Sequence, residues 1–195
     1  GADGALARFE KVLGRLPADR DARLHDLLLC TLWGNRADLS FDSMAQTAYA
    51  GLEGGQTDGL LIDHRPQVLA RWKDDVGQID LVADNAGLEL LFDLALADFL
   101  LNAGLAQRVR FHLKSQPFFV SDTMIPDVRE ALARMAGRPA LQAMVGRLRD
   151  ALDGGSRADR RGDRRRHHRY QHGVSRPSRD RRSVGFGADA RSRPC

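Results

Sequence analysis

The hydrophobic and polar positions in the first third of the chain predict short helices. Residues 4–15 and 20–33 place apolar side chains at the 3.6-residue spacing of one helix face. Gly34 predicts the end of the second helix, because glycine commonly follows the last turn of a helix. Residues 35–60 are mostly polar, and Gly54 and Gly55 within them mark a loop, after which residues 63–73 predict one more short helix.

From Gly77 onward the pattern changes to strands and helices in alternation. Residues 79–83 are a short apolar run with β-branched side chains, which predicts a buried strand. Residues 87–102 are apolar nearly all round, which predicts a helix that is covered on more than one side and stopped by Gly104. Residues 108–113 alternate apolar and polar side chains, as a strand with one buried face does.

The order of these elements indicates the fold class. Residues 118–120 predict another short strand, and residues 126–136 and 139–152 predict two helices. Strand, helix, strand and helix in succession are typical of an α/β protein with a parallel, doubly wound sheet. In such sheets ligands bind at the carboxyl ends of the strands, so we expect the functional site there.

The charge of the chain is divided between two parts. Residues 156–195 carry a net charge of +9, and because the whole chain carries +4, residues 1–155 carry −5. The basic tail contains no Leu, Ile or Met, so it cannot bury enough apolar surface to offset its ordering entropy. We therefore expect residues 156–195 to be a disordered tail. An arginine-rich tail can also bind nucleic acid nonspecifically, although no specific nucleic-acid partner is expected.

The remaining composition bears on compartment. No apolar run reaches the roughly 18 uncharged residues that a membrane helix needs. The amino terminus lacks the basic and then apolar pattern of a signal peptide. Cys30 and Cys195 are too few for a disulfide framework or a metal cluster. We expect a cytoplasmic protein without a membrane partner, and the sequence makes no prediction of its oligomeric state.

Polar side chains follow two of the predicted strands. Asp84 and Asn85 come after the first strand, and Asp122 comes after residues 118–120. If these strands are parallel neighbours, two carboxylates and one amide converge into an oxygen-rich set that suits Mg²⁺ or Mn²⁺. Backbone amides near Ala86 and Gly87, where the next helix begins, would favour an anion. A metal beside an anion site suggests phosphate chemistry, whereas each residue taken singly also fits a cap or turn.

Three segments together resemble a known family. The segments "LWGNRADLS" (32–40), "DNAGLELLFDLALADFLL" (84–101) and "VRFHLKSQPFFVSDTMIPDV" (109–128) are similar to the damage-control phosphatases, the former domain of unknown function 89. Within that family the likeness is to the subfamily called acidic-residue methyltransferase-like. The resemblance implies a helical N-terminal part, here residues 1–73, followed by an incomplete Rossmann-like α/β/α domain over residues 74–155.

The resemblance also implies a function and its residues. Members hydrolyse sugar phosphates and related phosphorylated metabolites with the help of a divalent metal. Carried over, Asp84, Asn85 and Asp122 are the metal ligands, lie against the substrate and are catalytic. The implied metal is Mn²⁺ or Ni²⁺, with Mg²⁺ or Co²⁺ as further candidates.

Three further polar residues lie within the similar segments. Asn35 and Asp38 follow an apolar helix and could face the substrate, or could equally form a cap and turn. Glu89 lies about one helical turn beyond Asp84 and Asn85, which suits a substrate-binding role as well as that of a surface acid near a helix start.

The chain departs from the family beyond about residue 155. The family's later "DLNYR"-like and "RTxK"-like motifs, which bind the phosphorylated substrate, do not occur in this sequence. The tail is rich in Arg, Ser, Gly, Asp and Pro, which is typical of out-of-frame translation of GC-rich DNA. We hypothesise a frameshift near Gly155 and expect impaired phosphatase activity. The alternative is a noncatalytic metal-binding remnant with a basic tail.

Overall fold

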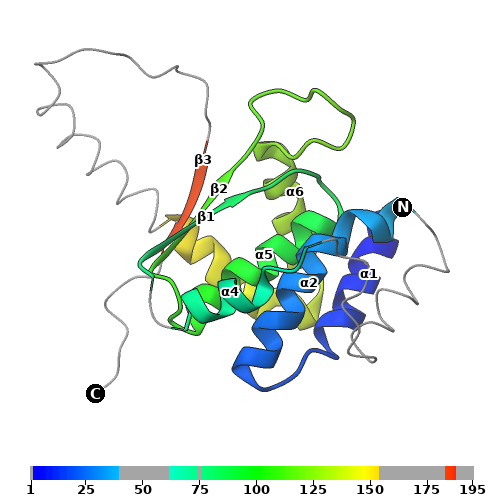
Figure 1. Cartoon of the computed structure of the whole chain (residues 1–195). Coiled ribbons are helices and arrows are strands. Elements are labelled where there is room, and N and C mark those ends of the chain that lie inside the picture. The colour runs from blue at the N-terminus through cyan, green and yellow to red at the C-terminus, as the bar shows by residue number, and fades with distance from the viewer. Residues whose placement is uncertain (1, 40–61, 74–75, 154–182, 188–195) are drawn as a thin grey trace, which may run out of the picture.

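A computed structural model describes residues 2–39, 62–73, 76–153 and 183–187 (Figure 1). The helices and strands follow in the order α1 Ala2–Leu13, α2 Arg20–Leu39, α4 Arg65–Arg71, β1 Gln78–Val82, α5 Leu88–Asn102, β2 Arg108–His112, α6 Ile125–Ala136, a 3₁₀ turn Pro139–Leu141, a helix over residues 142–153, and β3 Ser183–Gly187. In these described ranges no helix combines the length and apolar character that crossing a membrane requires.

The strand-helix-strand unit expected after Gly77 is present. Strands β1 and β2 pair in parallel from Gln78 opposite Arg108 to Val82 opposite His112, and α5 connects them. Side chains of the two strands such as Ile79, Val109 and Phe111 are buried. The α/β class predicted from the sequence is confirmed, and the described part is an incomplete domain of this class.

Helix α5 lies at the centre of the molecule (Figure 1). It packs against α1 and α2, against α6 and against β2, so the prediction that it is covered on more than one side is confirmed. Phe92 of α5 meets Phe9 of α1 edge to face, with 5.2 Å between the ring centroids. One hydrophobic core contains side chains that precede residue 74 in the sequence and side chains that follow it. The core is shared because the N-terminal helices α1 and α2 pack against α5.

The end of α5 also agrees with the sequence. The helix stops at Asn102, and Gly104 has a φ of +68°, a left-handed conformation that glycine adopts without strain. The last helix, residues 142–153, is fixed to α5 by a bidentate ion pair. Arg147 donates to both carboxylate oxygens of Asp98, at 2.8 and 2.7 Å.

The prediction that Gly34 ends the second helix is wrong. Helix α2 continues to Leu39, and Gly34 is a buried position inside it. A Cβ atom at position 34 would lie 2.5 Å from the Cα of Glu89. The glycine is needed there because α2 approaches the backbone of α5 closely, which is a packing requirement rather than a helix stop.

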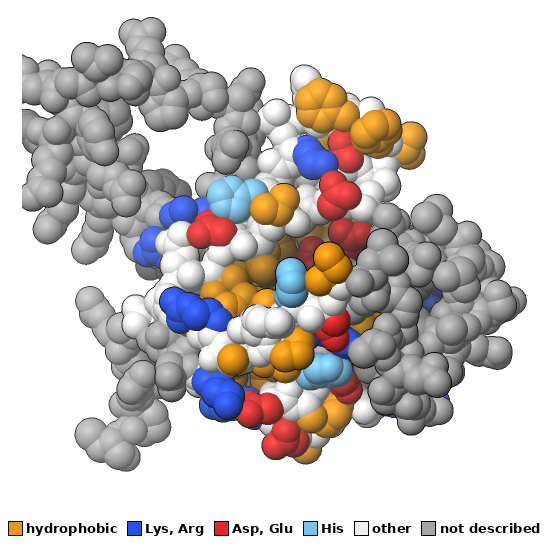
Figure 2. All heavy atoms as spheres, viewed as in Figure 1, with side chains coloured by type: hydrophobic (Ala, Val, Ile, Leu, Met, Phe, Trp, Pro, Cys, Tyr) orange, Lys and Arg blue, Asp and Glu red, His pale blue; other side chains and the backbone are white. Residues whose placement is uncertain are grey.

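The prediction of a strand over residues 118–120 is also wrong. Phe118, Phe119 and Val120 form bends and a turn in the loop between β2 and α6, and their side chains are exposed. The backbone amides of both phenylalanines donate to the carboxylate of Asp122 instead of to a neighbouring strand. Figure 2 shows apolar side chains gathered over this loop, with charged side chains directly beneath them.

The expectation of a wholly disordered tail is wrong for one segment. Residues Ser183–Gly187 form β3, which pairs antiparallel with β2 from Ser183 opposite His112 to Gly187 opposite Arg108. Strand β2 therefore has a partner on each side. Ladder hydrogen bonds come from the backbone, so a segment without Leu, Ile or Met can still join a sheet.

Candidate metal and phosphate site

The loop between β1 and α5 carries the first two candidate residues. Strand β1 ends at Val82, Asp84 and Asn85 follow, and Gly87 then turns the chain into α5 with a φ of +89°. A positive φ is strained for residues with a Cβ, so the glycine permits this abrupt turn. The Asp84 side chain is 65% exposed and can meet a solvent-borne ligand.

Backbone hydrogen bonds hold Asp122 beside this loop, although no strand leads to it. The amide of Thr123 donates to the carbonyl of Asp84 at 3.0 Å, and the amide of Ala86 donates to the carbonyl of Ser121 at 2.7 Å. Asn85 and Asp122 form an isolated antiparallel bridge. The three predicted metal ligands are therefore brought together, through a loop-to-loop bridge rather than through two parallel strand ends.

The backbone amide of Ala86 does not contribute to the anion site expected near Ala86 and Gly87. The amide of Ala86 is engaged by the Ser121 carbonyl, so it does not face a ligand. Its hydrogen bond fixes the distance between the two loops instead.

Asp122 has one carboxylate oxygen held and one facing the site. Its side chain is only 4% exposed, and Oδ2 accepts hydrogen bonds from the amides of Phe118 at 2.8 Å and Phe119 at 3.1 Å. These two donors are the main cause of a pKa below the usual range for an aspartate, and Lys114 adds to the shift. Asp122 therefore carries its negative charge at neutral pH.

Lys114 places a positive charge between the two carboxylates. Its Nζ donates to Asp84 Oδ1 at 2.8 Å and lies 3.5 Å from Asp122 Oδ1. The hydrogen bond to Asp84 is the main cause of a raised lysine pKa. A lysine that directly follows a strand is commonly solvated, so only the contacts of its ammonium with Asp84 and Asp122 reveal that Lys114 belongs to the site.

Asn85 is oriented by three side chains. Its Nδ2 donates to Asp84 Oδ2 and to Glu89 Oε2, each at 3.2 Å. Its Oδ1 accepts from the Ser121 hydroxyl at 2.7 Å and keeps a second lone pair. Glu89 also accepts from the Asn85 amide at 3.3 Å, so the glutamate positions the asparagine, whereas Ser121 is a partner that the sequence did not suggest.

The remaining predicted residues are placed only in part. Asn35 and Asp38 lie in the last turns of α2, and Gly34 places that helix against Glu89. The side chains of Asn35 and Asp38 are outside the described part of the structure, so their substrate contacts stay a prediction.

Asp93 lies one turn beyond Glu89 on α5, and no sequence motif marks it as a site residue. Burial and the nearby charge of Glu89 raise its pKa to about 7.

The donor set fits a hard divalent cation with few protein ligands. Within the described ranges no group of three His, Cys, Asp or Glu side chains could hold a metal ion. The set formed here is two carboxylates and one amide oxygen, and two of its members already share a cation, the ammonium of Lys114. Such a set leaves coordination positions for water and substrate, as Mg²⁺ and Mn²⁺ sites commonly do.

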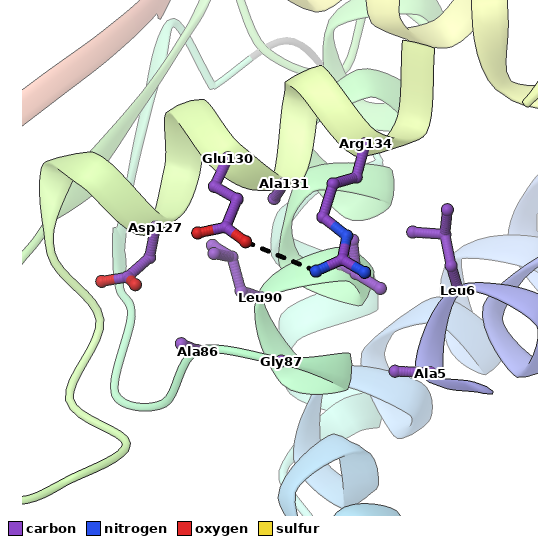
Figure 3. A pocket seen from close by; sticks show the side chains of 10 residues that line it. Ala5, Leu6, Ala86, Gly87, Leu90, Asp127, Glu130, Ala131 and Arg134 are labelled. Atoms are coloured by element: carbon purple, nitrogen blue, oxygen red, sulfur yellow. Dashed lines mark hydrogen bonds and ion pairs between the residues drawn. The ribbon is translucent and has the colours of Figure 1, made fainter. Parts of the chain in front are cut away.

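A small pocket adjoins the loop that carries Asn85. It lies between α1, the start of α5 and α6 and has a volume of about 170 Å³. Figure 3 shows Glu130 and Arg134 of α6 turned toward each other, joined by a 3.4 Å ion pair. The pocket is lined by Ala5, Leu6, Ala86, Gly87, Leu90, Leu91, Asp127, Glu130, Ala131 and Arg134.

Comparison with known proteins decides the family. The sequence model of the "Damage-control phosphatase ARMT1-like domain" matches residues 2–160, most of the chain. The chain belongs to this family. The resemblance that the three sequence segments suggested is confirmed. The names of the family and of its members support a phosphatase-type function for this family.

Curated relatives agree with the family assignment. The chain is similar to proteins named damage-control phosphatase ARMT1 from Homo sapiens, with 42% identity over 113 residues, and from Danio rerio, with 37% over 121 residues. Each alignment covers 52% of this chain, and 26% and 25% of the relative. The relative from Mus musculus is 36% identical over 139 residues, which cover 60% of this chain and 29% of that protein. The aligned region thus spans about a quarter of the curated relatives.

Proposed function

We propose that the protein is a metal-dependent phosphatase for small phosphorylated metabolites, sugar phosphates in particular. Asp84 and Asp122 converge on one cation, the ammonium of Lys114, next to Asn85, and this convergence carries the proposal. The chain also belongs to the damage-control phosphatase ARMT1-like family. The relatives are named phosphatases, which supports hydrolysis of a phosphate ester. We further propose a cytoplasmic location, no specific nucleic-acid partner and Mn²⁺ or Ni²⁺ as the metal, with Mg²⁺ or Co²⁺ as alternatives.

In this reaction some residues would hold the metal ion and others would orient the residues that hold it. Asp84, Asn85 and Asp122 would hold the ion, which when bound supplies positive charge to a phosphoryl oxygen and acidifies water. The amides of Phe118 and Phe119 keep Asp122 ionised and in place. Glu89 and Ser121 hold the Asn85 amide in one orientation, which leaves its oxygen available as a ligand.

The same proposal includes a weak activity for this polypeptide. The basic motifs that the family resemblance implies for phosphate binding do not occur in this sequence. Phosphoryl transfer depends on groups that position and neutralise the phosphate, so hydrolysis without them is slow. Because these phosphate-binding groups are missing, the second candidate function is that of a noncatalytic metal-binding remnant. Its basic tail, residues 156–195, would bind nucleic acid nonspecifically.

Phosphate release from a hexose phosphate tests the proposal. We expect release that requires added Mn²⁺, is abolished by chelation, and is slower than that of the Homo sapiens relative. Asp122→Ala should abolish it, whereas Asp150→Asn, which removes an exposed carboxylate from the last helix, should not change it. Release that persists in Asp122→Ala would contradict the proposed site. Mn²⁺ binding that depends on Asp122, without any phosphate release, would favour the second candidate.

A further inference from the structure

The carboxylates of Asp84 and Asp122 each have one oxygen that neutral donors already occupy. Asp122 Oδ2 accepts from the amides of Phe118 and Phe119, and Asp84 Oδ2 accepts from Asn85 Nδ2. The other oxygen of each carboxylate, Oδ1, faces the ammonium of Lys114. The two oxygens that remain for a metal ion are thus the two that the lysine holds.

The side chain of Lys114 can leave this position while its backbone stays fixed in the fold. Its amide donates to the carbonyl of Thr123 at 3.0 Å, which fixes its backbone beside the site. Its side chain is 31% exposed and ends in a flexible four-carbon stem, so the ammonium can turn into solvent. Asp84 and Asp122 come from segments held by their own backbone bonds, so they stay in place when the ammonium leaves.

We propose that Lys114 is an internal counter-ion that occupies the metal position between Asp84 and Asp122 and is displaced when a divalent ion binds. Without metal, one ammonium neutralises the repulsion between two carboxylates that the fold brings together. With metal, the ion takes over the Oδ1 atoms and the lysine is released. Metal affinity is therefore set by competition with a side chain of the same protein. This inference rests on the proposed function, because it takes the same three residues as metal ligands.

Mn²⁺ affinity, measured by isothermal titration calorimetry, tests this competition. Lys114→Met should bind Mn²⁺ about fivefold more tightly, since a solvent-exposed ion pair of this kind is a weak competitor for the metal position. Lys114→Arg keeps the positive charge and should bind no more tightly than the parent. Lys73→Met removes the same charge at an exposed position after α4 and controls for net charge.

Thermal unfolding supplies a readout that needs no catalysis. Metal-free Lys114→Met should unfold at a lower temperature than the parent, because two carboxylates lose their counter-ion, and saturating Mn²⁺ should remove the difference. Unchanged Mn²⁺ affinity in Lys114→Met, in a parent whose binding depends on Asp122, would overturn the role of Lys114 alone. Absence of Asp122-dependent Mn²⁺ binding in the parent would overturn the metal site and this proposal with it.

Discussion

Gly34 of α2 lies against the backbone of Glu89 in α5, so closely that a Cβ atom at position 34 would stand 2.5 Å from the Glu89 Cα. The contact joins the helical N-terminal part to the first turn of the helix that follows Asp84 and Asn85. Glu89 in turn holds Asn85 through two hydrogen bonds. A packing contact between two helices therefore helps to position a candidate metal ligand.

Gly34→Ala should destabilise the protein, because the added methyl group meets backbone that cannot give way. We expect a loss of about 1–3 kcal/mol in the free energy of unfolding, measured by urea denaturation. Gly146→Ala is the matched control, since position 146 lies in the last helix with nothing near the added methyl group. That variant should be neutral or up to about 1 kcal/mol more stable. Equal effects of the two substitutions would contradict the close approach.

Asp122→Ala should release the loop that carries Phe118 and Phe119. Both backbone amides lose their acceptor, so their hydrogen exchange should become faster, as NMR or mass spectrometry can measure. Phe119→Ser, which changes an exposed side chain and keeps the acceptor, should leave the exchange at position 118 unchanged and alter the free energy of unfolding by at most about 0.5 kcal/mol. Exchange that is equally slow in Asp122→Ala and the parent would show that other contacts hold the loop.

Glu89→Gln should weaken metal binding without removing a metal ligand. The substitution takes away one negative charge and disturbs the two hydrogen bonds that orient Asn85. Side chains that orient metal ligands are commonly worth about 10- to 100-fold in affinity, and we expect the lower end of that range for Mn²⁺. Glu130→Gln, an exposed position on α6, should leave the affinity unchanged. A fully retained affinity in Glu89→Gln would indicate that Asn85 is oriented without it.

Asp93→Asn should stabilise the protein increasingly as pH rises. Burial, assisted by Glu89, raises the folded-state pKa of Asp93 to about 7, above the ordinary value of 3.8. Between these values the folded form retains a proton that the unfolded form has lost, so the parent loses stability as pH rises and levels off above pH 7.

The asparagine variant lacks this penalty. Its advantage in the free energy of unfolding should grow by up to about 1 kcal/mol per pH unit over this window, measured by urea denaturation from pH 4 to 8. Asp150→Asn controls for the loss of one negative charge. An advantage independent of pH would contradict the raised pKa.

Local periodicity was sufficient for much of the fold. The bounds of β1, α5, β2 and α6 agree with the pattern to within about two residues, the uncertainty of any such boundary. Each of these elements buries a face whose spacing is written in adjacent residues. The place of Asp84 and Asn85 directly after a strand could also be predicted, whereas their role as metal ligands stays a prediction.

Three features depended on contacts that the local pattern does not contain. Gly34 resembles a helix stop in the sequence, but the position needs glycine because the backbone of Glu89 lies too close for a Cβ atom. Residues 118–120 have the composition of a strand but bend around the carboxylate of Asp122. Residues Ser183–Gly187 join the edge of β2 across a long sequence separation.

By itself the sequence determined which residues carry the candidate chemistry, since Asp84, Asn85 and Asp122 stand in segments that resemble one family. Only the tertiary structure decided how they meet and that Lys114 joins them. The physical reason is distance along the chain. Asp84 and Lys114 are separated by 30 residues, and the 2.8 Å contact between them exists only because β1 and β2 pair in parallel and end at the same edge of the sheet.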